Sequence, residues 1–165
     1  MSNTPRLSLP MLAVGQAQKE FFHNEALQRL DGVVAAAVET LPGNTPPGAP
    51  GIGAAYIVGT SPTGAWAGQG KALASFTEGG WRFVAPCEGM TAYVRSDAVW
   101  AAYVGSAWEV GQLRGSKLTV GGLQVVGSRA SAIAGPNGGT TVDSEARASI
   151  NQILTMLRTH GLIAP

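Results

Sequence analysis

The sequence is poor in the side chains that build covalent or metal-bound frameworks. It contains one cysteine, Cys87, and two histidines among 165 residues. A single cysteine excludes an internal disulfide. One cysteine and two histidines also fall short of the four ligands of a usual structural zinc site. We therefore expect a fold held by packing and hydrogen bonds, without a metal ion or a cofactor.

Charged residues are scarce as well. They make up 13% of the chain, and the formal net charge is +1. A nucleic-acid-binding surface needs clustered basic residues, so we expect no nucleic-acid partner. The chain has no apolar run of about 18 residues, which predicts no membrane insertion. The opening MSNTPRLSLP lacks the basic and apolar regions of a signal peptide, so we expect synthesis in the cytoplasm.

The abundant residues are apolar residues, glycine and proline. Hydrophobic residues account for 45% of the chain, which also has 23 glycines and 10 prolines. So little charge beside so much apolar surface favours a subunit covered by partners over a soluble monomer. The glycines and prolines lack a collagen-like period and predict many turns.

Residues 1–41 are predicted to form an arm followed by an attachment helix. Pro5 and Pro10 favour an extended arm over residues 1–14, lying on the domain or on a neighbouring subunit. Residues 16–41 have helical spacing of apolar side chains, and Pro42 and Gly43 end the predicted helix. Four residues at steps of four, three and four form one stripe, a candidate oligomer interface: Ala26, Leu30, Val33 and Ala37.

A small antiparallel β domain is predicted over residues 56–126, between two linkers. The Pro/Gly-rich residues 42–55 form the first linker and the Gly-rich residues 127–140 the second. Short β-type runs bounded by turn residues recur without an intervening helix-length segment, which favours antiparallel pairing. The runs are YIVG, ALASF, WRFVA, TAYVR, WAAYV and WEVG. Three further motifs, TGAW, EGGW and GSAW, predict hairpin turns whose tryptophan starts the next strand.

Residues 141–163 predict a C-terminal helix. Thr141 or Asp143 can cap its start, and Gly161 is placed to end it. A second apolar stripe with steps of four, three and four is a further candidate oligomer interface: Ala146, Ile150, Ile153 and Leu157. The stripe is too short to sustain an isolated helix, so this helix must pack on its own domain or in a bundle. The predicted fold class is therefore α+β: an arm and helix, a small antiparallel β domain, and a C-terminal helix.

No pattern of residues predicts catalysis. His23, Asn24 and Glu25 are consecutive on a helix and point in three directions, so they cannot converge on one substrate atom. We expect no enzymatic activity. The β segment contains every tryptophan, and aromatic faces can stack on sugars or fill a core. We weigh three of them as candidate glycan-binding residues: Trp66, Trp81 and Trp108.

The N-terminal motif resembles a known family. Leu9-Pro10, Gly15 to Lys19, Asn24 to Leu27 and Leu30-Asp31 are similar to the opening signature of uncharacterised proteins of alphaproteobacterial prophages, tailed phages and gene transfer agents. Tyr56 to Val58, Thr63 to Gly68, Gly80-Trp81 and Pro86 to Gly89 resemble the β region of that family. The ending TVDSEARASINQILTMLRTHGLI is similar to tails of phage fibre and spike proteins.

The resemblance implies a virion structural protein, made in the bacterial cytoplasm and located in the virion. We expect a homo-oligomer, with a trimer as the expected symmetry, that acts as a head-spike or tail-fibre component or adaptor supporting host attachment. Its partners would be other copies and other virion proteins at a capsid vertex, spike fibre or tail. The alternative is a carbohydrate-binding module that contacts host capsule or lipopolysaccharide.

Overall fold

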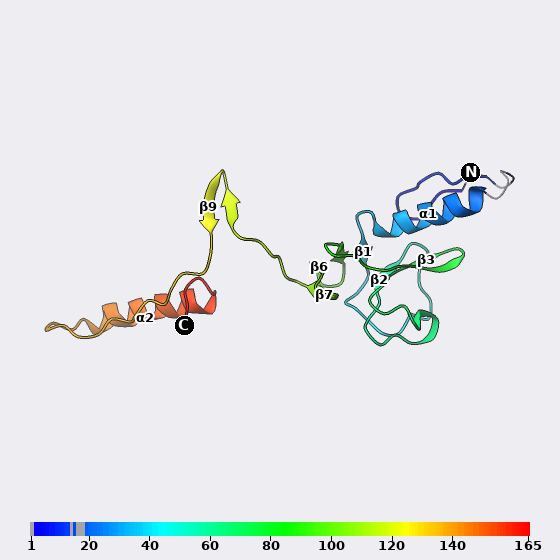
Figure 1. Ribbon diagram of the computed structural model, residues 1–165. Helices are drawn as coiled ribbons and strands as arrows, with labels where there is room; N and C mark the ends of the chain where they lie inside the picture. The colour runs from blue at the N-terminus through cyan, green and yellow to red at the C-terminus, as the bar shows by residue number, and fades with distance from the viewer. Residues whose placement is uncertain (1, 14, 16–18) are drawn as a thin grey trace. The chain divides into compact units, whose positions relative to one another are not determined.

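The computed structural model describes residues 2–13, 15 and 19–165. The chain divides into two compact units, Met1–Leu113 and Arg114–Pro165. The described residues form an N-terminal helix, short and mainly antiparallel strands, and a C-terminal helix (Figure 1). The predicted α+β class is therefore confirmed.

Helix α1 spans Lys19–Val33 and is shorter than the helix predicted over residues 16–41. Residues 16–18 of that prediction lie outside the described residues. Beyond Val33 the prediction is wrong, because the chain turns through Ala35, whose φ of 47° is uncommon for a residue with a side chain. Ala37 then pairs in a strand, so tertiary pairing outweighs its helix-compatible spacing.

Two small sheets build the first unit. One has the order β2-β3-β4, with strands Ala55–Ile57, Leu73–Thr77 and Gly80–Val84. The other has the order β1-β5-β6-β7, with strands Ala37–Val38, Thr91–Val94, Val99–Val104 and Ala107–Val110. Strands β2 to β7 overlap the six predicted runs. All neighbours pair antiparallel except β1, which is parallel to β5.

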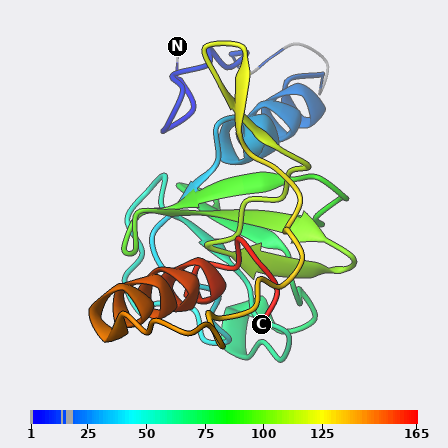
Figure 2. The ribbon, with the colours of Figure 1, turned by 90° about the vertical axis from the view of Figure 1, so that its left-hand side faces the viewer.

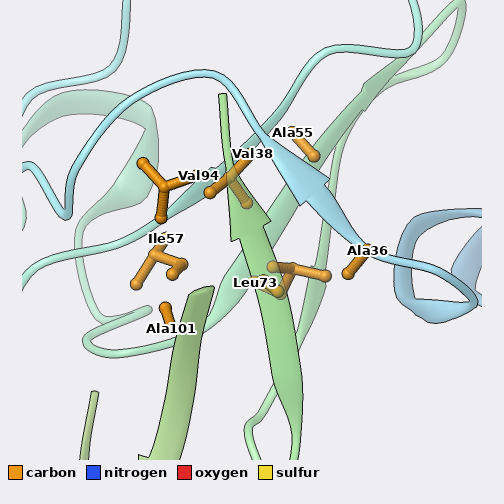
Figure 3. Close-up of a cluster of buried hydrophobic side chains, with 8 residues drawn as sticks. Ala36, Val38, Ala55, Ile57, Leu73, Val94 and Ala101 are labelled. Carbon is orange, nitrogen blue, oxygen red and sulfur yellow. The ribbon is translucent and has the colours of Figure 1, made fainter. Parts of the chain in front are cut away.

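Strand β1 brings the two sheets together over the main core. The Tyr93 N–H donates to the Ala36 carbonyl on one side of β1, and the Glu39 N–H donates to the Ala55 carbonyl of β2 on the other. Figure 3 shows side chains from both sheets meeting in one cluster. Its buried members are Ala36, Val38, Ala55, Ile57, Leu73, Ala92, Val94 and Ala101. Six of these eight are alanines or valines, so the two sheets approach closely.

A second, aromatic core lies on the other face of the β2-β3-β4 sheet. Trp66 is 1% exposed and packs with Val58, Ala72 and Ala74. Its ring centroid lies 5.3 Å from that of Trp81, in an edge-to-face contact. The TGAW motif forms the 3-10 helix η1, Gly64–Trp66, and not the predicted hairpin turn. The EGGW and GSAW motifs do form the β3–β4 and β6–β7 turns.

The predicted Pro/Gly linker of residues 42–55 is an integral part of the first unit. The Gly43 N–H donates to the Ile57 carbonyl, and the Gly53 N–H donates to the Phe76 carbonyl. The Asn44 side-chain oxygen accepts from the Ser61 N–H at 3.0 Å. Glycine and proline here shape tight turns that are tied to the sheets, so this segment does not separate two domains.

The second unit contains a hairpin and helix α2. Strands β8, Leu118–Val120, and β9, Leu123–Val126, pair antiparallel. Helix α2 spans Ser144–Thr159, within the predicted residues 141–163. The Asp143 carboxylate caps it by accepting from the Ala146 N–H at 2.8 Å. Gly161 ends it at a φ of 70°, and the Leu162 N–H donates back to the Leu157 carbonyl.

The border between the units therefore falls near residue 113, and not at residues 126–127. The β8–β9 hairpin lies within the predicted β domain of residues 56–126, but in the structure it belongs to the second unit. The predicted linker of residues 127–140 runs beside α2, as both ribbon views show (Figures 1 and 2). Arg147 and Arg158 of α2 donate to the carbonyls of Gly138 and Ile133 and hold this segment in place.

Candidate interaction surfaces

The N-terminal arm folds onto its own helix. The buried Asp31 carboxylate accepts hydrogen bonds from Thr4 Oγ1 at 2.7 Å, the Arg6 N–H at 3.0 Å and the Leu7 N–H at 2.6 Å. The Asn24 side chain both donates to and accepts from the backbone of Leu12. Of the two sites predicted for the arm, the domain and a neighbouring subunit, the structure places it on the domain.

Arg6 links this arm to the end of α1. Its guanidinium donates to the carbonyls of Asp31 at 2.6 Å, Gly32 at 3.2 Å and Ala35 at 2.9 Å. The last carbonyls of a helix have no partner within the helix and carry its negative partial charge. A guanidinium at this position satisfies them and replaces the C-terminal glycine that usually ends a helix.

A groove runs between α1 and β4, and we call it the α1–β4 groove. It consists of two adjoining hollows that share Arg29 and Phe83. The larger, of about 600 Å³, is lined by aromatic and polar side chains: Phe21, Phe22, Glu25, Arg29, Gln69, Trp81, Arg82 and Phe83. The smaller, of about 450 Å³, is lined mainly by apolar ones: Ala26, Arg29, Leu30, Val33, Phe83, Val84 and Ala85.

An ion pair joins the two walls of this groove, α1 and β4. Arg82 Nε donates to Glu25 at 2.7 Å, and Arg29 Nε donates to the other oxygen of the same carboxylate at 3.1 Å. Partial burial alone would raise the pKa of Glu25, but the hydrogen bonds and charges of the two arginines outweigh it. The pKa of this carboxyl therefore lies below its ordinary value of 4.5.

The three candidate glycan-binding tryptophans have different environments. Trp66 is buried in the aromatic core, so its face is not available to a sugar, and its candidacy is wrong. Trp81 is half-buried and lines the α1–β4 groove beside Gln69. Trp108 is half-buried, and its indole N–H donates to the Lys71 carbonyl at 2.7 Å. The prediction overlooked Trp100, which is 52% exposed.

The alternation of residues along β6 indicates that Trp100 is exposed. Ala101 is fully buried, and residues alternate between the two faces of a strand, so Trp100 points outward. Its partner across the ladder is Tyr93, and their rings lie 5.4 Å apart. Arg95 follows two residues after Tyr93 and therefore emerges on the same face. Exposed Trp100 and half-buried Tyr93 therefore form an aromatic face, with exposed Arg95 beside them.

The stripe predicted on the N-terminal helix is only partly accessible. Ala26 and Leu30 are exposed, whereas Val33 packs against the main core and Ala37 belongs to β1. Phe21 and Phe22, at 68% and 75% exposure, are the most exposed aromatic residues of α1. The accessible apolar surface of this helix therefore lies along the α1–β4 groove.

The stripe predicted on the C-terminal helix is largely exposed. Ala146, Ile150 and Ile153 are exposed, and Leu157 is half-buried. Leu154 is the residue that α2 buries within its own unit. A mainly apolar hollow of about 440 Å³ follows the outer face of α2, lined by Ser149, Gln152, Ile153, Met156, Leu157 and His160.

The β8–β9 hairpin leaves all of its strand residues exposed. Its ladder aligns Val120 with Leu123 and Thr119 with Gln124. Paired residues share a face, so one face carries the apolar side chains of Leu118, Val120, Leu123 and Val126, and the other carries Thr119 and Gln124. A register shift between Leu118 and Thr119 leaves Val125 outside the paired positions. Leu118, Val120 and Leu123 are more than half exposed, and Val126 is 43% exposed. The hairpin is therefore amphipathic, with an apolar face that nothing in its own unit covers.

The described part of the chain contains neither a candidate metal site nor a helix that could cross a membrane. No cluster of three or more histidine, cysteine, aspartate or glutamate side chains suitable for a metal ion occurs among those residues. None of the helices described there combines the length and hydropathy needed to cross a bilayer.

Comparison with known protein families gives a match. The model of the family described as "Protein of unknown function (DUF2793)" matches residues 23–109. This range covers more than half of the chain and extends from α1 to β7. No curated protein matches the chain. The chain belongs to the DUF2793 family.

Proposed function

We propose that this chain is a non-enzymatic structural component of the virion of a tailed phage or gene transfer agent. It acts as a homo-oligomeric head-spike or tail-fibre component, or as an adaptor, that supports host attachment. The observation that carries the proposal is the second unit, which leaves most of its apolar side chains uncovered. Its buried apolar side chains are Leu154 and Ile163.

Such a unit is too small to be stable by its own packing. A domain of about 60 residues is already marginal, and an isolated two-stranded hairpin is marginal at best. Residues 114–165 form a shorter unit than that, with a smaller core. Association with other chains supplies the missing burial, which supports assembly as the role of this unit.

The apolar surface of α2 favours a trimer over a dimer. Ile150, Ile153 and Leu157 form a seam, and exposed Met156 widens it on one side. In a dimer each helix seam meets one neighbour, whereas in a trimer it lies between two. The widened seam therefore matches a three-helix arrangement.

The mass of the chain in solution tests the assembly. We expect sedimentation equilibrium of the full chain to give three times the monomer mass at micromolar concentration. Ile153→Asp should release monomers, and Ala148→Asp, on the opposite side of α2, should leave the mass unchanged. A stable monomer in the wild type would contradict the proposal.

The virion location needs a separate measurement. We expect mass spectrometry of purified particles to detect the chain in constant proportion to the capsid protein. Deleting its gene should yield particles that adsorb poorly to the host, and a complementing copy should restore adsorption. Particles that lack the chain and adsorb normally would rule out a role in attachment.

The alternative, a carbohydrate-binding module, is favoured by the exposed face of Trp100, Tyr93 and Arg95. The exposed ring of Trp100 can stack on the apolar face of a sugar, and Arg95, which is also ion-paired with Glu39, can donate hydrogen bonds beside it. Binding of host capsule or lipopolysaccharide should fall on Trp100→Ala and persist in Trp108→Phe. Absence of binding by the wild type removes this alternative.

A further inference from the structure

Strand β4 has an open edge within the first unit. In the β2-β3-β4 sheet it pairs with β3 on one side, and no other strand of the described chain pairs with it. Along a strand of an antiparallel pair, successive residues direct their N–H and C=O groups alternately toward the paired strand and away from it. The Trp81 carbonyl accepts from the Arg82 guanidinium, so Trp81 and, by alternation, Phe83 direct backbone groups to the open edge.

The α1–β4 groove borders this edge. Helix α1 forms its far wall through Ala26, Leu30 and Phe22, and β4 forms the near wall through Phe83 and Val84. An edge strand facing a helix across an apolar groove accepts an added strand, with backbone hydrogen bonds to the edge and alternate side chains in the groove. The geometry therefore fits an extended or hairpin segment that is apolar on one face.

The β8–β9 hairpin has these properties. Its apolar face, formed by Leu118, Val120, Leu123 and Val126, is exposed, and its polar face can remain in solvent. The segment from Leu118 to Val126 contains no charged residue, so burying one face desolvates no charge. Each outer edge of a two-stranded hairpin also offers unpaired backbone groups. Both the β4 edge and the hairpin have backbone groups without a strand partner, and both have exposed apolar side chains. If the hairpin docks at the β4 edge, both sets of backbone groups can pair and both apolar surfaces are buried.

We propose that the β8–β9 hairpin of one copy of this chain adds to the β4 edge of a second copy and buries its apolar face in the α1–β4 groove. The inference rests on the proposed homo-oligomer and names its interface. The two contacting surfaces differ, so the contact is head-to-tail. Three such contacts close a ring, and each copy then has its groove filled and its hairpin covered.

Matched substitutions on the two faces of the hairpin test the contact. Leu123→Glu places a carboxylate on the apolar face, and Gln124→Glu places the same group one residue away on the polar face. We expect Leu123→Glu to raise the concentration of half-assembly by at least about tenfold. We expect Gln124→Glu to leave it unchanged. Both positions are exposed, so far-UV circular dichroism should show the same fold in both variants.

Disulfide trapping between two pools shows which copy supplies the hairpin. Both pools carry Cys87→Ser; one adds Ala85→Cys beside the groove, and the other adds Val120→Cys on the hairpin. A disulfide between differently tagged chains can form only between copies. We expect it to form readily, and to form less when Thr119→Cys replaces Val120→Cys. A third chain with both Ala85→Cys and Val120→Cys, oxidised at high dilution, tests for a link within one copy.

The outcomes separate this inference from the proposed function. Disulfides between pools, together with loss of assembly in Leu123→Glu, support the contact. An oligomer that tolerates Leu123→Glu and forms no such disulfide overturns the contact and leaves the oligomer standing. A link only within the doubly substituted chain shows that the hairpin covers its own groove, which also overturns it. A wild-type monomer overturns both.

Discussion

Asp31 and Thr4 lie 27 residues apart in the sequence, and their side chains form a buried hydrogen bond of 2.7 Å. The same carboxylate accepts from two backbone N–H groups of the arm, so one side chain holds the arm against α1. Asp31 is therefore the buried acceptor at the centre of the contacts between the arm and α1.

Asp31→Ala should destabilise the first unit by about 2–4 kcal/mol, because it leaves three buried or half-buried donors without an acceptor. Urea unfolding of the full chain, followed through a first-unit tryptophan, measures the loss. Asp97→Ala in the exposed β5–β6 turn is the matched control and should change stability by less than about 0.5 kcal/mol. If both variants lose the same free energy of unfolding, the Asp31 contacts contribute no more to stability than an exposed carboxylate does.

Glu25 should make stability depend on pH. Its folded pKa lies below 4.5, so its contribution is complete above that pH and is lost as the pH falls toward the folded pKa. Glu25→Gln should lower stability at pH 7, and the difference from wild type should shrink as the pH falls below 4.5. Denaturant midpoints between pH 3 and pH 7 measure this. Glu78→Gln, an exposed change in the β3–β4 turn, is the control, and its denaturant midpoints should follow those of wild type across this pH range.

Substitutions of Trp66 and Trp100 should differ in their effects on the stability of the protein and on the quenching of its fluorescence. Trp66→Phe should cost about 1–3 kcal/mol through lost packing volume. No hydrogen bond is lost there, because the Trp66 indole N–H has no partner among the described residues. Trp100→Phe should cost less than about 0.5 kcal/mol and should remove much of the fluorescence that acrylamide quenches. Strong quenching that survives in Trp100→Phe would contradict the assigned exposures.

Gly32 should not tolerate a side chain, although it lies in a helix. A Cβ at this position would clash with the Oγ of the buried Ser75, so α1 approaches β3 closely. Gly32→Ala should gain up to about 1 kcal/mol of helix propensity and lose about 1–3 kcal/mol to overpacking. Ser75→Ala should recover part of that loss in the double variant. Additive effects in the double-mutant cycle would argue against direct contact.

The sequence predicted best what local patterns determine. The alternation in WRFVA and the turn residues of EGGW place β4 and its hairpin correctly, because both signals lie within a few residues. Asp143 and Gly161 likewise identify the two ends of α2. Capping and hairpin geometry depend on adjacent residues, so a single sequence is sufficient to predict them.

The errors arose where a distant contact outweighs a local pattern. Ala37 fits a helical stripe, but it pairs with Tyr93 in a strand. The Pro/Gly-rich residues 42–55 have the composition of a linker, but their backbone groups bond to Ile57 and Phe76. The α1–β4 groove depends on the ion pair of Glu25 with Arg82, 57 residues later. No periodicity in the sequence encodes that pairing.

The parallel pairing of β1 with β5 also sets the order in which the first unit can form. Ala37 and Val38 pair with Tyr93 and Val94, so the loop between them must close before this parallel ladder can form. Closing a long loop costs entropy and slows folding relative to local hairpins. On the ribosome, β1 therefore stays without its parallel partner β5 until residue 94 has been synthesised.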